Sequence, residues 1–366
     1  MMTTYNVISA DSHVIEPPNL WVDYIEPEFK DRAPHCVQEN GYDVFKCDGG
    51  VELIQVGGLS AAGVPSDQLQ GPGTYAKINP GAWDPTPRLD EMAADGVQAE
   101  VLYPSIALRM FAIVDPRYQL ACFRAYNAWM VDFVKAHPDR FRGIGLVPIE
   151  DMGVAATEVR RCREQGLSGV AISVNPSEDR TYDDPLFDPL WSAAQDSGLP
   201  ISLHILTARK YKPDAGIDKL ANTITQAIHI QHALVRMIFS GVLHRFPGLT
   251  VISAENDIGW AAHLLERMDY IFERRRASLP KDVPWDLAPS DLFRRSVHLT
   301  FMRDRAGVVA RDAIGVDNIM WASDYPHTDS TWPNSQKMIE RLCEGIPDED
   351  RHKIVMANAA RMYAFN

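Results

Sequence analysis

The feature that most constrains the fold is a regular alternation of short, apolar, β-rich runs with amphipathic helical stretches. Eight such runs are present, and a helical stretch precedes each of them except the first. Alternation of this kind predicts a parallel sheet with helices packed outside it. Eight units favour closure of that sheet into a (β/α)8 TIM barrel. The eight runs cover residues 5–10, 99–103, 143–147, 169–173, 200–204, 250–254, 296–300 and 319–322.

An open, doubly wound sheet is the alternative architecture for the same alternation. Such a sheet normally carries a glycine-rich phosphate loop after its first strand, whereas Asp11, Ser12 and His13 occupy that place here. The length of 366 residues suits one barrel with insertions. We therefore expect a single α/β domain over residues 1–366.

One segment, residues 22–86, interrupts the alternation. Residues 37–47 and 51–56 are candidates for a hairpin, and residues 57–82 are rich in glycine and proline. A connection of this length is usually a functional lid or an insertion. Because it follows the first strand, we expect it to lie over the catalytic mouth of the barrel. The alternative is a disordered excursion on the surface.

Composition excludes several classes of function. A net charge of −13 makes nucleic acid an unfavourable partner, and no apolar run is long enough to span a membrane. The first residues lack the basic segment and apolar core of a signal peptide, so we expect a cytoplasmic protein. The five cysteines are odd in number and show no CxxC spacing, which argues against a disulfide framework or a zinc–thiolate site.

Polar side chains stand at the ends of four predicted strands. Asp11 and His13 follow the first strand, and side chains two positions apart on an extended chain face the same way. His204 ends the fifth strand, Glu255 follows the sixth, and Asp324 follows the eighth. Catalytic groups of a parallel barrel come from these strand ends, so we expect the five side chains to meet. Carboxylates together with imidazoles suit a divalent metal such as zinc, manganese or iron.

Some of these residues also have an ordinary structural explanation. His204 could be a core histidine with satisfied hydrogen bonds. Glu255 could cap the following helix, although Asn256 and Asp257 can cap it instead. An uncompensated carboxylate at the end of an apolar strand is costly to bury, which favours the metal explanation for Glu255.

Other acidic and histidine residues are candidates with weaker support. Glu16, three residues after His13, is either a further ligand or a loop carboxylate. His327 and Asp329 follow Asp324 and either complete the site or form hydrogen bonds within their own loop. His229 and His232 fall in a helical segment, where a structural role is the simpler explanation.

The sequence resembles the amidohydrolase-related (amidohydrolase 2) family of metal-dependent barrels. This family contains aminocarboxymuconate semialdehyde decarboxylase and related aromatic-acid decarboxylases and hydrolases. The likeness runs over nearly the whole chain. It is clearest in residues 8–21 (ISADSHVIEPPNLW), 239–269 (FSGVLHRFPGLTVISAENDIGWAAHLLERMD), 321–333 (WASDYPHTDSTWP) and 358–365 (NAARMYAF).

The resemblance implies a metal site at matching positions. In the family, an acidic or histidine residue and a histidine two positions later bind the metal after strand one, and here these are Asp11 and His13. A histidine after strand five is the next ligand, here His204, and an aspartate after strand eight is a ligand or base, here Asp324. The chain departs from the family at strand six, where a histidine is common and Glu255 stands instead.

This departure shapes the expected function. Many carboxylates around one ion would repel each other, and two cations would neutralise them. Carboxylate-rich sites with few imidazoles are typical of non-heme di-iron oxygenases, and the superfamily includes such a branch, the di-iron monooxygenase of the platensimycin and platencin pathways. We therefore expect a monooxygenase with two irons that hydroxylates a bulky apolar or acyl thioester substrate. The expected metal ligands are Asp11, His13, Glu16, His204, Glu255, Asp324 and Asp329, and the expected catalytic residues are Glu255, Asp324 and His327.

Two other functions stay open. One is a hydrolase that uses a metal-bound hydroxide with Asp324 or Glu255 as the base. The other is non-oxidative decarboxylation of an organic acid, with the metal acting as a Lewis acid. Either would need one zinc or manganese ion in place of two irons. A small molecule is the expected substrate, and the resemblance is compatible with a homodimer.

Overall fold

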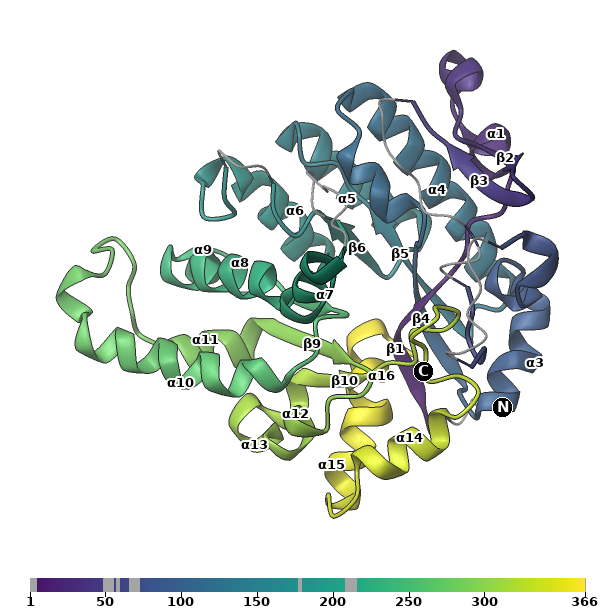
Figure 1. Cartoon of the computed structure of the whole chain (residues 1–366). Coiled ribbons are helices and arrows are strands. Elements are labelled where there is room, and N and C mark those ends of the chain that lie inside the picture. Colours follow the sequence, from purple (N-terminus) through teal and green to yellow (C-terminus); the bar gives the residue numbers. More distant parts are fainter. Residues whose placement is uncertain are drawn as a thin grey trace.

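Eight parallel strands stand at the centre of the molecule, and helices surround them (Figure 1). The computed structural model describes residues 5–48, 56, 60–65, 73–176, 180–207 and 216–365. Neighbouring strands pair in the order in which they occur along the chain, which confirms the predicted (β/α)8 barrel. The strands are β1 (Ile8–His13), β4 (Ala99–Tyr103), β5 (Phe141–Leu146), β6 (Gly169–Ile172), β7 (Ile201–His204), β8 (Val251–Ala254), β9 (Val297–Phe301) and β10 (Ile319–Trp321).

The helices between the strands begin and end at clear sequence signals. Asp84, Asp115 and Asp151 each accept a hydrogen bond from a backbone N–H in the first turn of the helix that follows. Gly96 and Gly166 end two helices in the left-handed conformation. The longer helices are α3 (Pro85–Asp95), α4 (Pro116–Ala136), α5 (Met152–Gln165), α6 (Asp188–Ser197), α7 (Gly216–Thr225), α8 (Ala227–Phe239), α10 (Gly259–Arg274), α11 (Pro289–Ser296) and α14 (Ser335–Leu342). The shorter ones are α1 (Leu20–Tyr24), α9 (Val242–Arg245), α12 (Arg305–Val309), α13 (Arg311–Ile314), α15 (Asp348–His352) and α16 (Asn358–Tyr363).

The first strand extends further than its sequence suggests. It runs from Ile8 to His13, so Asp11 and His13 belong to the strand itself and do not follow it. Its pairing with β4 shifts by one residue between Ser9 and Ser12, which is a β-bulge. Bulges of this kind commonly redirect side chains next to active sites.

The barrel closes between its first and last strands through a few specific bonds. The backbone N–H of His13 donates to the carbonyl of Tyr325 at 2.7 Å, and the N–H of Asp324 donates to the carbonyl of Asp11 at 3.0 Å. The buried guanidinium of Arg88 adds a hydrogen bond to the carbonyl of His13 at 2.8 Å and pairs with the buried carboxylate of Glu100 at 2.5 Å. This closure therefore brings residues 11–13 and 324–325 side by side.

The segment over residues 22–86 contains a hairpin in a different place from the predicted one. Strands β2 (His35–Glu39) and β3 (Tyr42–Lys46) pair antiparallel and together overlap the first of the two candidate segments. In the second candidate segment, residues 51–55 lie outside the described residues. The tight turn at Asn40 and Gly41, both with positive φ, explains the shorter hairpin. The hairpin lies beside α4 in Figure 1. The role of residues 22–86 as a lid stays a prediction.

No helix among the described residues combines the length and apolar character needed to cross a membrane.

Candidate metal centre

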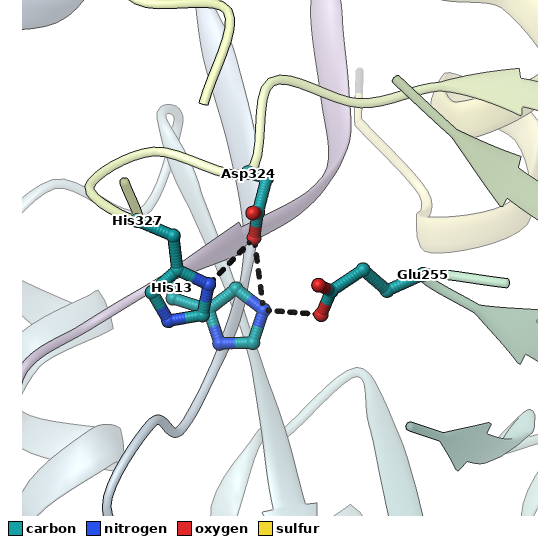
Figure 2. Close-up of side chains that lie close together, drawn as sticks. All are labelled: His13, Glu255, Asp324 and His327. Carbon is teal, nitrogen blue, oxygen red and sulfur yellow. Dashed lines mark ion pairs between the residues drawn. The ribbon is translucent and has the colours of Figure 1, made fainter. Parts of the chain in front are cut away.

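Five side chains from the ends of four strands converge at the mouth of the barrel. Asp11 and His13 come from β1, His204 ends β7, Glu255 follows β8, and Asp324 lies three residues after β10. We call these five residues the metal centre. His13 Nε2 lies 3.5 Å from Asp11 Oδ1, 3.7 Å from Glu255 Oε2 and 3.4 Å from Asp324 Oδ1. His204 Nε2 lies 3.7 Å from Asp11 Oδ1 and 3.4 Å from Glu255 Oε2. Figure 2 shows His13, Glu255 and Asp324 pointing toward one another.

Asp11 Oδ1, His13 Nε2, His204 Nε2 and Glu255 Oε2 are buried and have no hydrogen-bond partner among the described residues. The fifth inward-facing atom, Asp324 Oδ1, is buried as well and lies 2.8 Å from His327 Nδ1. Buried polar atoms without a partner are costly, and several of them in one place call for a bound group. Two ligands that are each about 2.1 Å from one cation stand about 3.0–3.6 Å apart at angles of about 90–120°. The observed separations of 3.4–3.7 Å are close to that range. The ligand atoms form two overlapping groups that share His13, one with Asp11 and His204 and the other with Glu255, Asp324 and His327, and the donors of each group suit a divalent cation.

The two imidazoles are held in the form that binds a metal. His13 Nδ1 lies 2.7 Å from the carbonyl oxygen of Pro104, and His204 Nδ1 lies 2.9 Å from the carbonyl oxygen of Ile205. Because a carbonyl can only accept, each Nδ1 must carry the proton. Each Nε2 then presents its lone pair to the centre, as metal-bound histidines in proteins typically do.

Thr300, at the end of β9, connects two of the carboxylate residues. Its hydroxyl donates to Asp11 Oδ2 at 2.9 Å and accepts a hydrogen bond from the backbone N–H of Glu255 at 2.9 Å. The bond to Oδ2 leaves Asp11 Oδ1 to face the centre. Thr300 therefore orients both residues from outside the ligand set.

The backbone is strained at two of the ligands. Glu255 has φ of 56° and Asp324 has φ of 58°, which is the left-handed region that residues other than glycine rarely adopt. Strain of this kind clusters at functional sites, where the surrounding structure maintains it. Here it occurs one residue after β8 at Glu255 and three residues after β10 at Asp324, where both side chains face the centre.

The charges in the centre are unbalanced without a cation. Burial and the neighbouring carboxylates of Asp324 and Asp11 raise the pKa of Glu255 well above its ordinary value. Burial also raises the pKa of Asp324 to about 7 and lowers the pKa of His13 to about 4. Burial alone would raise the pKa of Asp11, but His13 and His204 outweigh it and lower the pKa. A divalent cation would compensate three carboxylates whose charges otherwise repel each other.

Two of the predicted ligands lie elsewhere. Glu16 is fully buried, but its two carboxylate oxygens accept hydrogen bonds from the backbone N–H groups of Ile106 and Ala107 at 2.9 and 2.8 Å. Burial raises the pKa of Glu16 to about 7. The chain turns after β1, so Glu16 reaches the turn after β4 and not the centre. Asp329 is exposed and lines the pocket beside the centre. It belongs to neither of the two groups of described residues whose ligand atoms lie within 4.8 Å of one another.

The three other candidate histidines divide into two groups. His327 lies against the centre, with its ring centroid 4.0 Å from that of His13 and its Nδ1 2.8 Å from Asp324 Oδ1 (Figure 2). His229 and His232 are exposed on α8, as expected for residues with a structural role or none at the site.

The pocket above the centre is strongly acidic. Its lining includes five carboxylate residues, one in β1 and four in the loops after β8 and β10, together with Gln226 and Thr300. The complete lining consists of Asp11, Gln226, Glu255, Asp257, Thr300, Phe301, Met302, Ala322, Asp324 and Asp329. Glu255 is the most accessible member of the metal centre, since its side chain is 16% exposed and the other four are at most 2% exposed.

Sequence reasoning missed the residues that orient the ligands. Thr300 was detectable, because it is a polar residue at the end of a predicted strand. Ser105, whose hydroxyl lies 2.9 Å from His327 Nε2, follows the end of β4 and has the same signal. The carbonyls of Pro104 and Ile205 give no signal in a sequence, because every residue has a carbonyl.

Comparison with known proteins shows the family and the fold of this chain. A family model described as Amidohydrolase matches residues 76–365. The gamma-resorcylate decarboxylase of Rhizobium sp. (strain MTP-10005) is 26% identical over 296 residues, which cover 75% of this chain and 86% of that relative.

Two solved structures share the fold over almost their whole length. The 5-carboxyvanillate decarboxylase from Sphingomonas paucimobilis has a TM-score of 0.69 and 24% identity, and the match covers 99% of this chain and 100% of that one. The dihydroxybenzoic acid decarboxylase from Polaromonas sp. JS666, solved with bound manganese and the inhibitor 2-nitroresorcinol, has a TM-score of 0.65 and 19% identity. That match covers 99% of this chain and 98% of the other.

These findings overturn the expected oxygenase. The relatives are decarboxylases, and the metal named in the Polaromonas structure is manganese. The expectation of a non-heme di-iron monooxygenase is therefore wrong, and so is the expectation that the enzyme is an oxygenase. The structure also places Glu16 and Asp329 outside the centre, so fewer carboxylates face it than the di-iron expectation assumed. The donor set of the centre suits a divalent metal.

Proposed function

The chain belongs to the amidohydrolase family, and we propose that within this family it is a metal-dependent, non-oxidative decarboxylase of an aromatic carboxylic acid. The observation that carries the proposal is the cluster of buried histidine and carboxylate donors around His13, with Asp11 and His204 on one side and Glu255 and Asp324 on the other, which suits a divalent ion such as manganese. The decarboxylases among its relatives support the reaction class.

The reaction needs an acid at the mouth of the barrel. When carbon dioxide leaves an aromatic acid, the carbon–carboxylate bond breaks, its electron pair stays on the ring carbon, and a proton takes the place of the carboxylate. No oxidant is consumed. A divalent ion in the centre would supply Lewis acidity toward the polar groups of the substrate.

We assign the proton transfer to Glu255. It lines the pocket, and it is the one residue of the metal centre with an appreciably exposed side chain. The neighbouring carboxylates of Asp324 and Asp11 favour its protonated form. Asp11, His13, His204 and Asp324, at most 2% exposed, would hold the ion. Water then restores the proton to Glu255 after each turnover.

Carbon dioxide release in heavy water tests the proposal. Manganese-loaded protein is incubated without oxygen with 2,6-dihydroxybenzoate, 5-carboxyvanillate and related hydroxylated benzoates, and the products are analysed by mass spectrometry. We expect equal rates with and without oxygen, and one deuterium at the carbon that carried the carboxylate. Consumption of oxygen, or hydrolysis of ester or amide analogues without release of carbon dioxide from any acid, would overturn the proposal.

A further inference from the structure

A turn outside the ligand set contacts the metal centre at two points. Residues 104–106 connect β4 to the following 3-10 helix (Ala107–Ala112). The carbonyl of Pro104 accepts from His13 Nδ1, and the hydroxyl of Ser105 lies 2.9 Å from His327 Nε2. The carboxylate of Glu16 holds this turn through the backbone N–H groups of Ile106 and Ala107.

The contact between Ser105 and His327 continues to Asp324, a member of the metal centre. His327 Nδ1 lies 2.8 Å from Asp324 Oδ1, so Ser105, His327 and Asp324 form one chain of polar contacts that ends at the metal centre. If His327 Nδ1 carried no proton, its lone pair would face the lone pairs of a carboxylate at 2.8 Å, which is repulsive. In the neutral ring the proton therefore belongs on Nδ1, and Nε2 must accept from the Ser105 hydroxyl.

Ser105 does not have the position of a nucleophile, although a serine, a histidine and an aspartate stand in line. Its side chain is buried, and neither Ser105 nor His327 lines the pocket. A substrate in the pocket meets Glu255 and Asp324 first. The chain of contacts is thus suited to holding a ligand in place and not to attacking a substrate.

We propose that Ser105 is a positioning residue for the metal centre: by donating to His327 Nε2 it fixes the ring that orients Asp324, and Glu16 supports it by holding the turn. The inference rests on the divalent-metal site of the proposed function. Partners of metal ligands outside the ligand set typically change metal affinity by about 10–100-fold when they are removed.

Manganese binding to the metal-free full-length protein tests this without a substrate. The electron paramagnetic resonance signal of free Mn²⁺ reports the Kd. We expect Ser105→Ala to raise the Kd by about tenfold or more, and Ser105→Thr, which keeps the hydroxyl, to restore it toward the wild-type value. The matched control is Ser335→Ala, because Ser335 is an equally buried serine whose hydroxyl bonds to Asp95 and contacts no residue of the metal centre.

A double-mutant cycle decides whether Ser105 acts through His327. We expect His327→Ala to weaken binding as well, and Ser105→Ala to cause no further loss in the His327→Ala background. An unchanged Kd in Ser105→Ala, or an equal loss in both backgrounds, would overturn the proposal. Both readouts are separate from decarboxylation: coupled manganese binding without carbon dioxide release would leave the positioning role intact and reject only the proposed reaction.

Discussion

At the scale of single residues, Glu255 differs from the other members of the metal centre. Its side chain lines the pocket and is 16% exposed, whereas the side chains of the other four members are at most 2% exposed. One carboxyl can therefore meet both the ion and the substrate. This makes Glu255 the residue on which the proposed chemistry depends most directly.

Replacing Glu255 by glutamine removes the transferable proton and keeps the size of the side chain. We expect kcat for carbon dioxide release to fall by about 10²–10⁴-fold, with a smaller effect on KM. Steady-state kinetics and the manganese content of the same samples measure this. Glu266→Gln, an exposed position on the following helix α10, is the control and should keep wild-type kinetics. Full activity in manganese-loaded Glu255→Gln would remove Glu255 from the mechanism.

The sequence indicated a site at the strand ends because a barrel places the C-terminal ends of all its strands at one mouth. Asp11, His204 and Asp324 are far apart in sequence, yet parallel strands bring their C-terminal ends together. Glu16 was misassigned because nearness in sequence is no guide once the chain leaves a strand and turns. The backbone carbonyls that orient the imidazoles, such as that of Pro104, were out of reach of any pattern of residue types.

At the scale of elements, helix α1 and the hairpin β2–β3 are tied to the barrel through α4. Trp21 of α1 is fully buried, and its Nε1–H donates to the carbonyl of Cys122 at 3.1 Å. Its ring packs against Phe45 of β3, with centroids 5.6 Å apart. The hydroxyl of Tyr118 in α4 donates to the carbonyl of Arg32 at 2.7 Å. Helix α1 and the chain around Arg32 are thus attached to α4 by specific contacts, and the hairpin packs on α1.

Trp21→Ala should therefore destabilise the fold, because it removes a large buried ring and leaves a cavity. We expect a loss of about 3–5 kcal/mol in the free energy of unfolding, measured from urea denaturation curves. Val22→Ala, a partly exposed position on the same helix, should change the free energy by no more than about 0.5 kcal/mol. Equal effects of the two substitutions would show that α1 is not docked as described.

The order of elements was predictable, but the packing of this insertion was not. Alternating apolar runs identified all eight barrel strands to within three residues at each end. The hairpin was placed too late in the chain, since its turn at Asn40 and Gly41 lies inside a run that reads as one strand. The hydrogen bond from Trp21 to Cys122 joins residues 101 positions apart, and a single sequence does not reveal such pairs.

At the scale of the whole molecule, the metal and the fold support each other. Three carboxylates face His13: Asp11 and Asp324 are buried, Glu255 is partly buried, and Glu255 and Asp324 have strained backbones. An ion that binds the folded chain but not the unfolded chain raises the free energy of unfolding by about 2.7 kcal/mol when its concentration is a hundred times its Kd. Binding of the metal should therefore raise the free energy of unfolding of the entire domain.

Removal of the metal tests this link. We expect the thermal midpoint to fall by several degrees after treatment with a chelator and to recover as Mn²⁺ is added back, with a shift that grows with the concentration of the ion. Differential scanning calorimetry measures both steps. The double variant His13→Ala/His204→Ala should show no shift on addition of Mn²⁺, and a shift of wild-type size in that variant would contradict the assigned ligands.

The closure of the barrel between β1 and β10 also sets an order of events during synthesis. The ligands of the metal centre span residues 11 to 324, and the backbone bonds that join Asp11 to Asp324 and His13 to Tyr325 close the ring beside them. A nascent chain therefore lacks a complete centre until Asp324 has left the ribosome. A translation product truncated before Asp324 cannot acquire the complete set of proposed ligands.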